Sequence, residues 1–171
     1  CGTGLSSHEV ALGYRDVVDP SIYVHFPLLD ADEALVVWTT TPWTLPGNVA
    51  VAVAPETEYV RARRGGETLV VAAALRERAL GEGWEQVGAP FKGAELIGRR
   101  YRGPLFRLDD GGPRNAFQVI AGDFVTTDDG TGIVHLAPAY GEDDFDAAAK
   151  AGIFDPTAAG ELYNPVRRDG T

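Results

Sequence analysis

The stretch EYVRARRGGETLVVA, residues 58–72, indicates most directly how this chain folds. Two runs rich in strand-forming residues, 58–63 and 67–72, lie on either side of Arg64-Gly65-Gly66. Glycines at that spacing permit the positive φ angles that a tight hairpin turn needs. The stretch therefore predicts a β-hairpin.

Short strand patterns recur on both sides of this hairpin, starting with residues 21–29, where apolar side chains alternate with a period of two. Further strands are predicted at 34–39, 49–54, 99–102, 116–121, 124–127 and 132–136, with a turn at Asp128-Asp129-Gly130 between the last two. Helices are predicted only at 73–80 and 142–151, and most of 84–113 is rich in glycine and follows no clear pattern. This predicts a mainly β fold with peripheral helices (α+β), a closed or strongly curved β-barrel of about six or more strands.

Length and composition favour one globular domain over residues 1–171. The chain has 171 residues, of which 44% are hydrophobic, and no apolar run approaches the ~20 residues of a membrane helix. A single cysteine cannot form an internal disulfide, so a reducing cytoplasm is the expected location. The absence of methionine and the start at Cys1-Gly2 indicate a piece excised from a larger protein, in which Cys1 would suit half of a zinc knuckle.

The charge is strongly acidic but unevenly distributed. The formal net charge of −10 repels a phosphate backbone and disfavours broad nucleic-acid binding. Residues 1–60 carry −7, residues 61–114 carry +4 and residues 115–171 carry −7. The basic middle third is therefore either a set of solvated strand faces or the one surface suited to phosphate.

Several common catalytic motifs are missing. The sequence contains no Gly-x-Ser-x-Gly elbow, no Gly-x-x-x-x-Gly-Lys loop, no Cys-x-x-Cys and no His-Glu-x-x-His. These absences disfavour ordinary serine hydrolases, nucleotide-triphosphate enzymes and zinc proteases.

Two other stretches carry chemistry that structure alone explains poorly. Residues 38–48, WTTTPWTLPGN, place four hydroxyls at a strand end, where they either stiffen a corner or bind a small polar ligand. In residues 130–145, GTGIVHLAPAYGEDDF, His135 ends a strand and Glu142, Asp143 and Asp144 begin a helix. These acids either complement the helix dipole, with His135 a buried and satisfied histidine, or bind a cation such as a metal ion or an ammonium group.

These stretches resemble the editing (CP1) domain of isoleucyl-tRNA synthetase, a class I aminoacyl-tRNA synthetase. The resemblance covers the whole chain, through residues 1–10, 38–48, 130–145 and 163–166. The valyl and leucyl editing domains carry Thr-Thr-Arg-Pro followed by an acid and Thr. Here Thr41 stands in place of the Arg and Trp43 in place of the acid, which favours the isoleucyl branch.

The resemblance implies an aminoacyl-tRNA ester hydrolase. Valine and isoleucine differ by one methylene, worth ~1–3 kcal/mol in an apolar pocket, and isoleucyl-tRNA synthetase is a standard example of this limit and of its solution by a second, hydrolytic site. The implied reaction is editing of mischarged valyl-tRNA(Ile) after transfer, and of valyl-adenylate before it. Ligase activity would belong to the parent isoleucine–tRNA ligase.

The resemblance also implies roles for individual residues. Asp144 would bind the α-ammonium group of the amino acid. His135 would lie beside the side-chain pocket, where it limits size or positions water. The threonines of the other wall would bond the terminal adenosine, the amino acid or the attacking water. The implied catalytic residues are Asp144, Thr40, Thr41 and His135, and the implied substrate-binding residues are Trp38, Thr39, Thr44, Asn48, Asp144 and His135.

The expected partners are the 3′ end of tRNA(Ile), valine or valyl-adenylate, and the rest of the synthetase. No cofactor or metal is expected in this domain, while ATP, Mg and Zn are expected only for the parent enzyme. Three alternatives remain open: a valyl- or leucyl-type editing domain, a metal-assisted hydrolase using Asp143, Asp144 and His135, and a non-catalytic module that binds tRNA through the basic middle third.

Overall fold

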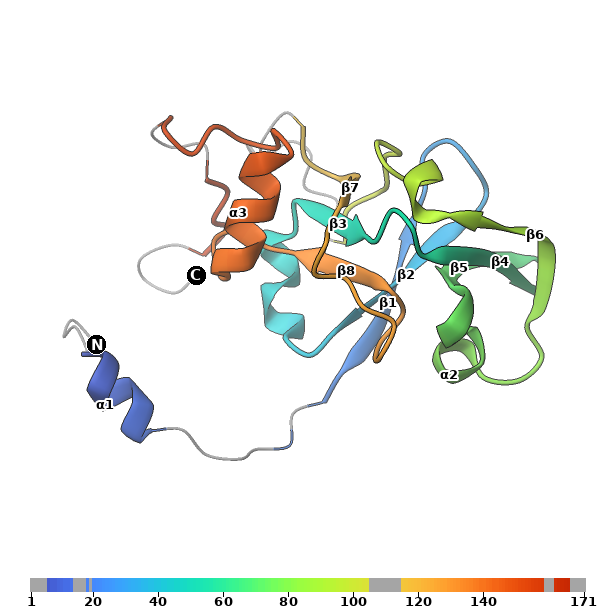
Figure 1. The fold of residues 1–171 in the computed structure, drawn as a ribbon, viewed down its shortest axis with the longest axis horizontal. Helices are drawn as coiled ribbons and strands as arrows, with labels where there is room; N and C mark the ends of the chain where they lie inside the picture. The colour runs from blue at the N-terminus through green and yellow to red at the C-terminus, as the bar shows by residue number, and fades with distance from the viewer. Residues whose placement is uncertain (1–5, 14–17, 19, 105–114, 159–161, 167–171) are drawn as a thin grey trace.

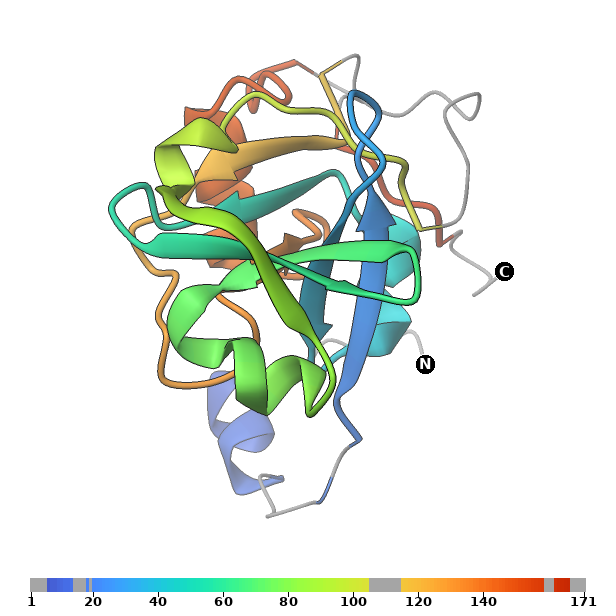
Figure 2. The same ribbon diagram turned by 90° about the vertical axis from the view of Figure 1, so that its right-hand side faces the viewer.

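One strongly curved β-sheet forms the framework of the chain, and Figures 1 and 2 show it from two sides. The computed structural model describes residues 6–13, 18, 20–104, 115–158 and 162–166. The strands run in the order β6-β4-β5-β2-β8-β3-β7, and β1 pairs with β2 beside this path. The strands are β1 (Ile22–Pro27), β2 (Ala34–Thr39), β3 (Ala50–Val53), β4 (Glu58–Arg64), β5 (Glu67–Ala72), β6 (Glu85–Lys92), β7 (Gln118–Ala121) and β8 (Ile133–Leu136). The predicted mainly β fold is confirmed, in the form of a curled sheet.

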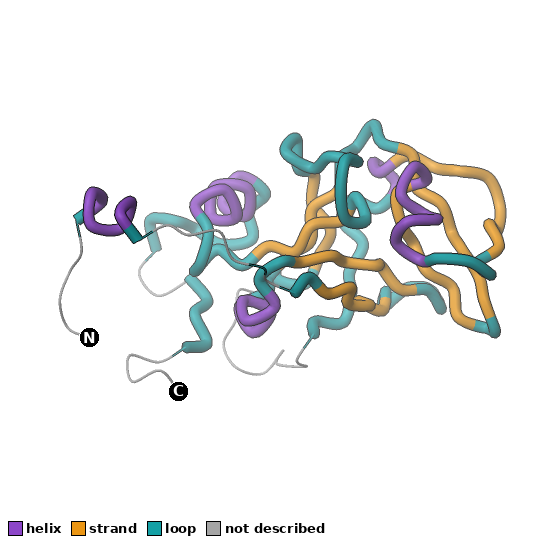
Figure 3. Tube along the Cα trace, turned by 90° about the horizontal axis from the view of Figure 1, so that it is seen from below, coloured by secondary structure: helices purple, strands orange, loops and turns teal. Residues whose placement is uncertain are grey.

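The helices are short and are drawn in purple in Figure 3. The α-helices are α1 (Ser7–Leu12), α2 (Arg76–Leu80) and α3 (Glu142–Lys150), and the 3₁₀ helices are η1 (Pro42–Gly47), η2 (Ala73–Leu75) and η3 (Gly93–Glu95). In the part of the chain that the structure describes, every helix is too short or too polar to cross a lipid bilayer.

The predicted hairpin forms from β4 and β5. Arg64 pairs with Glu67, so Gly65 and Gly66 alone make the turn. Their φ angles are +56° and +96°, a region in which a side chain would be strained. The predicted turn is therefore confirmed, except that Arg64 belongs to the strand.

The core lies inside the curve of the sheet, where strand β3 is buried on both faces. All four residues of β3 are 0% exposed, which explains its composition of small apolar residues. Buried aromatic rings close the core near β1. The ring of Tyr101 stacks on Phe26 at 5.1 Å between centroids and meets the edge of Phe117 at 6.0 Å.

The prediction of a strand at 124–127 is wrong. These residues form turns and bends, with the amide of Val125 donating to the carbonyl of Gly122. The segment enters β8 through Gly130 and Gly132, whose φ angles of +75° and +72° are incompatible with a continuous strand. A strand-like composition is overridden by these backbone turns.

The unassigned region contains β6, which the sequence pattern does not reveal. Among the described strands it pairs with β4 alone, and it contains Gly88 and Pro90 and is mostly exposed. An edge strand tolerates proline and needs no apolar alternation. The strand predicted at 99–102 is reduced to isolated bridges, in which Tyr101 pairs with Leu28 and Arg100 with Gln118.

The helix predictions are confirmed in part. The segment predicted as one helix at 73–80 begins with the 3₁₀ turn η2 before α2, and α3 ends one residue earlier than expected. Helix α1 was not predicted, and it lies apart from the sheet in Figure 1. Cys1 lies outside the described residues, so its zinc-ligand role stays a prediction, as does the single domain over 1–171.

Candidate active site

The topology of the sheet brings the two unusual stretches together. Strands β2 and β8 are parallel neighbours, with Trp38 opposite Val134. The carboxyl ends of parallel strands meet at one edge of a sheet, and ligands bind outside that edge in many α/β folds. The threonine-rich corner follows β2, and the turn into α3 follows β8.

A pocket of about 530 Å³ opens at this edge. It is lined by Trp38, Thr39, Thr40, Thr41, Trp43, Thr44, Val134, His135, Tyr140, Gly141 and Asp144. Of the residues implied by the resemblance, only Asn48 is not in the lining. Trp43 and Tyr140 were not named as site residues, although they are 62% and 41% exposed. Aromatic residues are more often found in the core, so their sequence alone does not suggest a place in the pocket lining.

The threonine wall combines a fixed corner with a free hydroxyl. The Thr39 hydroxyl accepts a 3.0 Å hydrogen bond from the amide of Thr41, and the Thr44 hydroxyl donates to the carbonyl of Thr41 at 2.8 Å. Thr40 is exposed, and no described residue offers a hydrogen bond to its hydroxyl. Thr39 and Thr44 therefore stiffen the corner, while Thr40 is available to a ligand.

His135 is buried and hydrogen-bonded at both ring nitrogens. Its side chain is 6% exposed, with Nε2 2.9 Å from the Thr44 hydroxyl and Nδ1 2.9 Å from Nδ2 of Asn48. Burial lowers the pKa of His135 to about 4, because the charged form loses its hydration. The imidazole is therefore neutral at pH 7.

Asn48 lies behind His135 rather than in the pocket wall. It is 1% exposed, and its amide nitrogen donates to the carbonyl of Ala50 at 2.9 Å. Its oxygen accepts a 2.7 Å hydrogen bond from the Tyr101 hydroxyl. Asn48 therefore does not line the pocket and contacts the lining through His135, and its implied role in substrate binding stays a prediction.

Asp144 lies in the first turn of α3 and is half-buried. Its Oδ2 accepts a 2.8 Å hydrogen bond from the amide of Ala137, and no described residue bonds to Oδ1. Burial raises the pKa of Asp144, the Ala137 amide opposes that shift, and the nearby Asp143 carboxylate adds to it. A cation placed against Oδ1 would relieve both unfavourable effects.

Asp143 faces a different part of the surface. It lines a second pocket of about 610 Å³, together with Asp146, Lys150 and the end of β7. Asp143, Asp144 and His135 thus do not converge as one set of metal ligands, and the described ranges hold no group of three His, Cys, Asp or Glu residues suited to a metal ion.

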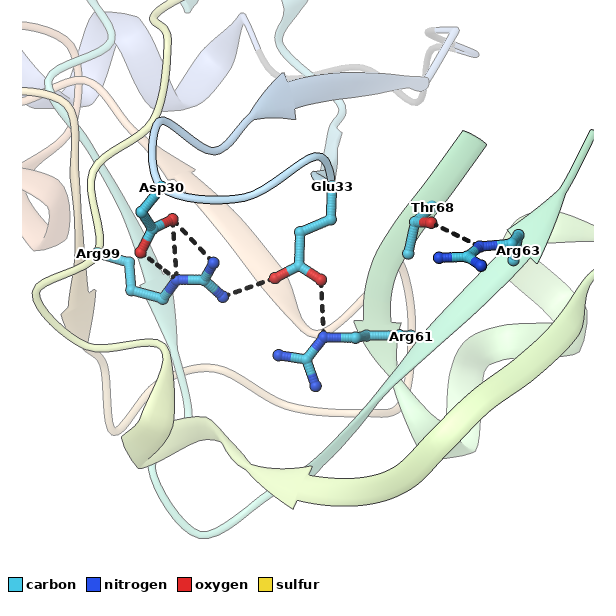
Figure 4. Close-up of polar contacts among 6 residues, drawn as sticks. All are labelled: Asp30, Glu33, Arg61, Arg63, Thr68 and Arg99. Atoms are coloured by element: carbon cyan, nitrogen blue, oxygen red, sulfur yellow. Dashed lines mark hydrogen bonds and ion pairs between the residues drawn. The ribbon is translucent and has the colours of Figure 1, made fainter. Parts of the chain in front are cut away.

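The arginines of the basic middle third are largely engaged within the protein (Figure 4). Glu33, whose side chain is 7% exposed, accepts hydrogen bonds of 2.7 Å from both Arg61 and Arg99. Arg99 also bonds Asp30 at 2.8 Å, and Arg61 lies over the ring of Phe91. Acids of the first third therefore neutralise two arginines of the middle third, Arg61 and Arg99, and a phosphate-binding surface there stays a prediction.

Comparison with known proteins shows similarity to isoleucine–tRNA ligases. No protein-family model matches the chain. The chain is 53% identical over its whole length to isoleucine–tRNA ligase of Streptomyces coelicolor, 51% identical to that of Thermobifida fusca, and 46% identical over 90% of the chain to that of Thermus thermophilus. It spans 16%, 16% and 15% of the length of these relatives.

Solved structures show the same fold. The crystal structure of GlLeuRS-CP1 aligns with a TM-score of 0.64 at 16% identity, over 86% of this chain and 70% of that chain. The editing domain of the Plasmodium knowlesi cytosolic leucyl-tRNA synthetase aligns with a TM-score of 0.57 at 13% identity, over 84% and 69%. The chain has the editing-domain fold of the isoleucyl- and leucyl-tRNA synthetase family. The resemblance drawn from the sequence motifs is thereby confirmed.

The structural matches and the sequence matches carry different information. The leucyl neighbours share its fold at low identity, whereas the isoleucine–tRNA ligases share about half of its residues over the whole chain. This agrees with the sequence features that favour the isoleucyl branch, Thr41 and Trp43.

Proposed function

We propose that this editing domain hydrolyses mischarged valyl-tRNA(Ile), and valyl-adenylate by the same chemistry, as part of an isoleucine–tRNA ligase. The observation that carries the proposal is the pocket itself, where the Asp144 carboxylate and a threonine wall lie together at the shared edge of β2 and β8. The proposed partners are the 3′ end of tRNA(Ile), the aminoacyl group and the rest of a synthetase, acting in the cytoplasm.

Asp144 is proposed to bind the α-ammonium group of the aminoacyl substrate. Its Oδ2 is fixed by the Ala137 amide, so the carboxylate has a defined orientation and presents Oδ1 to the ligand. A charge-assisted hydrogen bond in a partly buried site is both strong and directional. Binding the ammonium group at this point would orient the adjacent ester carbonyl.

His135 and the aromatic residues are proposed to define what enters the pocket. The neutral ring of His135 is fixed from both sides and forms a rigid wall, which suits a limit on side-chain size. The exposed rings of Trp43 and Tyr140 are suited to stack against the terminal adenosine. Because only this end must be held, an acidic domain needs no extended phosphate-binding surface.

The proposed hydrolysis uses water and an already activated ester. Water attacks the carbonyl carbon and forms the new carbon–oxygen bond, and the bond from that carbon to the ribose oxygen breaks. The ribose oxygen takes up the proton that the water gives up. Thr40 and Thr41 line the pocket, and their hydroxyl groups are proposed to orient the water or the carbonyl. His135 is neutral with both nitrogens engaged, so positioning rather than general-base catalysis is assigned to this site.

Exchanging Asp144→Asn tests this proposal. The variant removes the charge with little change of shape, and loss of one charge-assisted hydrogen bond worth about 1.5–3 kcal/mol predicts a fall of roughly ten- to a hundredfold in kcat/KM for valyl-tRNA(Ile). The matched control is Asp146→Asn on the same helix, because Asp146 is exposed and lines the second pocket. A folded Asp144→Asn variant that hydrolyses valyl-tRNA(Ile) as fast as the original chain would contradict the assignment.

A chelator separates this proposal from metal-assisted hydrolysis. Hydrolysis of valyl-tRNA(Ile) is expected to continue unchanged when EDTA is added, since the proposed residues use no metal. Loss of activity with EDTA and its return with a divalent ion would instead support the metal-dependent alternative.

A further inference from the structure

A line of hydrogen bonds connects the buried core to the pocket. The Tyr101 hydroxyl donates to Oδ1 of Asn48 at 2.7 Å, and Nδ2 of Asn48 donates to Nδ1 of His135 at 2.9 Å. On the other side of the ring, Nε2 lies 2.9 Å from the Thr44 hydroxyl, which donates to the carbonyl of Thr41 at 2.8 Å. The line thus runs from a residue outside the pocket to the threonine wall.

These contacts determine which nitrogen of His135 carries the proton. Nδ2 of Asn48 also donates to the carbonyl of Ala50, and Oδ1 accepts from Tyr101. Together these two bonds fix the amide orientation and make Nδ1 of His135 an acceptor. The one hydroxyl proton of Thr44 is directed to the carbonyl of Thr41, so Thr44 accepts from Nε2. Both contacts are satisfied together by the neutral imidazole with its proton on Nε2.

The Tyr101 hydroxyl has no evident role in packing. The ring itself fills the core between Phe26 and Phe117, and phenylalanine would fill the same volume. The residue is 1% exposed, and burying a hydroxyl costs free energy unless it is hydrogen-bonded. Its bond to Asn48 both satisfies the hydroxyl and occupies the amide oxygen, so that only the amide nitrogen faces His135.

We propose that Tyr101 is a positioning residue of the editing site, whose hydroxyl acts through Asn48 to hold His135 as the Nε2–H imidazole. In this state neither ring nitrogen is available to water or substrate, and His135 presents a rigid, chemically inert wall to the aminoacyl side chain. The effect on hydrolysis rests on the proposed function, whereas the effect on the His135 tautomer does not.

The test is Tyr101→Phe, examined by ¹⁵N NMR of the histidine side chains and by deacylation kinetics. The chain has three histidines, so the His135 signals can be assigned with a His135→Gln reference. The original chain is expected to show only the Nε2–H form at pH 7. In Tyr101→Phe a population of the Nδ1–H form is expected, with kcat for valyl-tRNA(Ile) reduced about three- to tenfold.

Tyr59→Phe is the matched control. Tyr59 is 0% exposed, and its hydroxyl donates to the carbonyl of Gly132 at 2.6 Å without contacting His135. This variant removes an equally buried hydroxyl and is expected to leave both the His135 spectrum and kcat unchanged. Equal changes in the two variants would show a general loss of packing and would overturn the proposal.

A second variant tests the line of bonds from the other direction. In Asn48→Asp the carboxylate accepts from Nδ1, so His135 is expected to take the Nδ1–H or doubly protonated form. The proposal is overturned if Tyr101→Phe and Asn48→Asp both retain the original spectrum, or if Tyr101→Phe changes the spectrum without changing kcat in an active enzyme. Failure of the original chain to hydrolyse valyl-tRNA(Ile) would contradict the proposed function alone, because the spectra would still test the tautomer.

Discussion

At the scale of single residues, the site depends on polar groups whose state is set by burial. His135 and Asp144 both have pKa values shifted toward the neutral form, in opposite directions on the pH scale. Neutral His135 requires no counterion from the ligand, whereas the charged form of partly buried Asp144 is stabilised by a nearby cation. The pocket therefore pairs an inert wall with a carboxylate that lacks a counterion among the described residues.

The shifted pKa of His135 makes stability depend on pH. The unfolded histidine takes up a proton near pH 6.5 and the folded one near pH 4, so acidification between these values favours unfolding by up to about 3 kcal/mol. The raised pKa of Asp144 acts in the opposite sense. Urea unfolding should therefore show that lowering the pH from 7 to 4.5 reduces the free energy of unfolding less in His135→Gln than in the original chain. Equal losses in both proteins would mean that His135 is not held neutral.

At the scale of elements, the sequence predicts those features that depend on local chemistry. The alternation in β1, the Gly65-Gly66 turn and the acids of α3 all have local causes, and the structure confirms them. Strand β6 is set by pairing with β4, and the strand-like residues 124–127 are set by the turns around them. No local pattern carries that information.

The same distinction applies to the site. Its two stretches stand out by composition, and the resemblance names most of the lining residues. The contact between Tyr101 and Asn48 joins positions 53 residues apart, so it follows only from the topology. The roles of Trp43 and Tyr140 depend on exposure, which their sequence context does not show.

Gly47, in the turn η1, lies close to the ring of Tyr140 in the pocket wall. A Cβ at Gly47 would lie 2.5 Å from Cε2 of Tyr140, whose exposed ring can move aside. Gly47→Ala is therefore expected to reduce deacylation several-fold by displacing Tyr140, while the free energy of unfolding changes by less than about 1 kcal/mol.

The hairpin turn supplies the contrasting variant. Gly66→Ala places a side chain at a φ of +96° with open space around it, so strain of about 1–2 kcal/mol should lower stability while deacylation is unchanged. Steady-state deacylation and urea unfolding of both variants measure this contrast. If Gly47→Ala lost only stability, the link from η1 through Tyr140 to the pocket would be wrong.

At the scale of the whole molecule, the unequal charge of the three thirds is partly cancelled by folding. Glu33 and Asp30 of the first third bond Arg61 and Arg99 of the middle third, as Figure 4 shows. Sequence-based charge counting cannot show this cancellation, because it depends on which strands become neighbours. We therefore interpret Arg61 and Arg99 as structural residues of the folded domain.

Glu33→Gln tests this structural interpretation. Glu33 is nearly buried and accepts hydrogen bonds from two arginines. The variant is therefore expected to lose about 1.5–3 kcal/mol of the free energy of unfolding. The loss should persist at high salt, since buried pairs are weakly screened. Asp32→Asn, at an exposed neighbouring position, is the control in the same urea titrations. A loss of stability no larger than in the control would contradict the structural interpretation and would leave these arginines available to bind tRNA.

We propose that the pocket beside Asp144 removes valine, and not isoleucine, from tRNA(Ile). The direct measurement is the rate at which this chain hydrolyses valyl-tRNA(Ile) and isoleucyl-tRNA(Ile) under identical conditions. We expect the valyl ester to be hydrolysed well above its spontaneous rate, and the isoleucyl ester to remain at its spontaneous rate. Equal hydrolysis of both esters, or of neither, would contradict it.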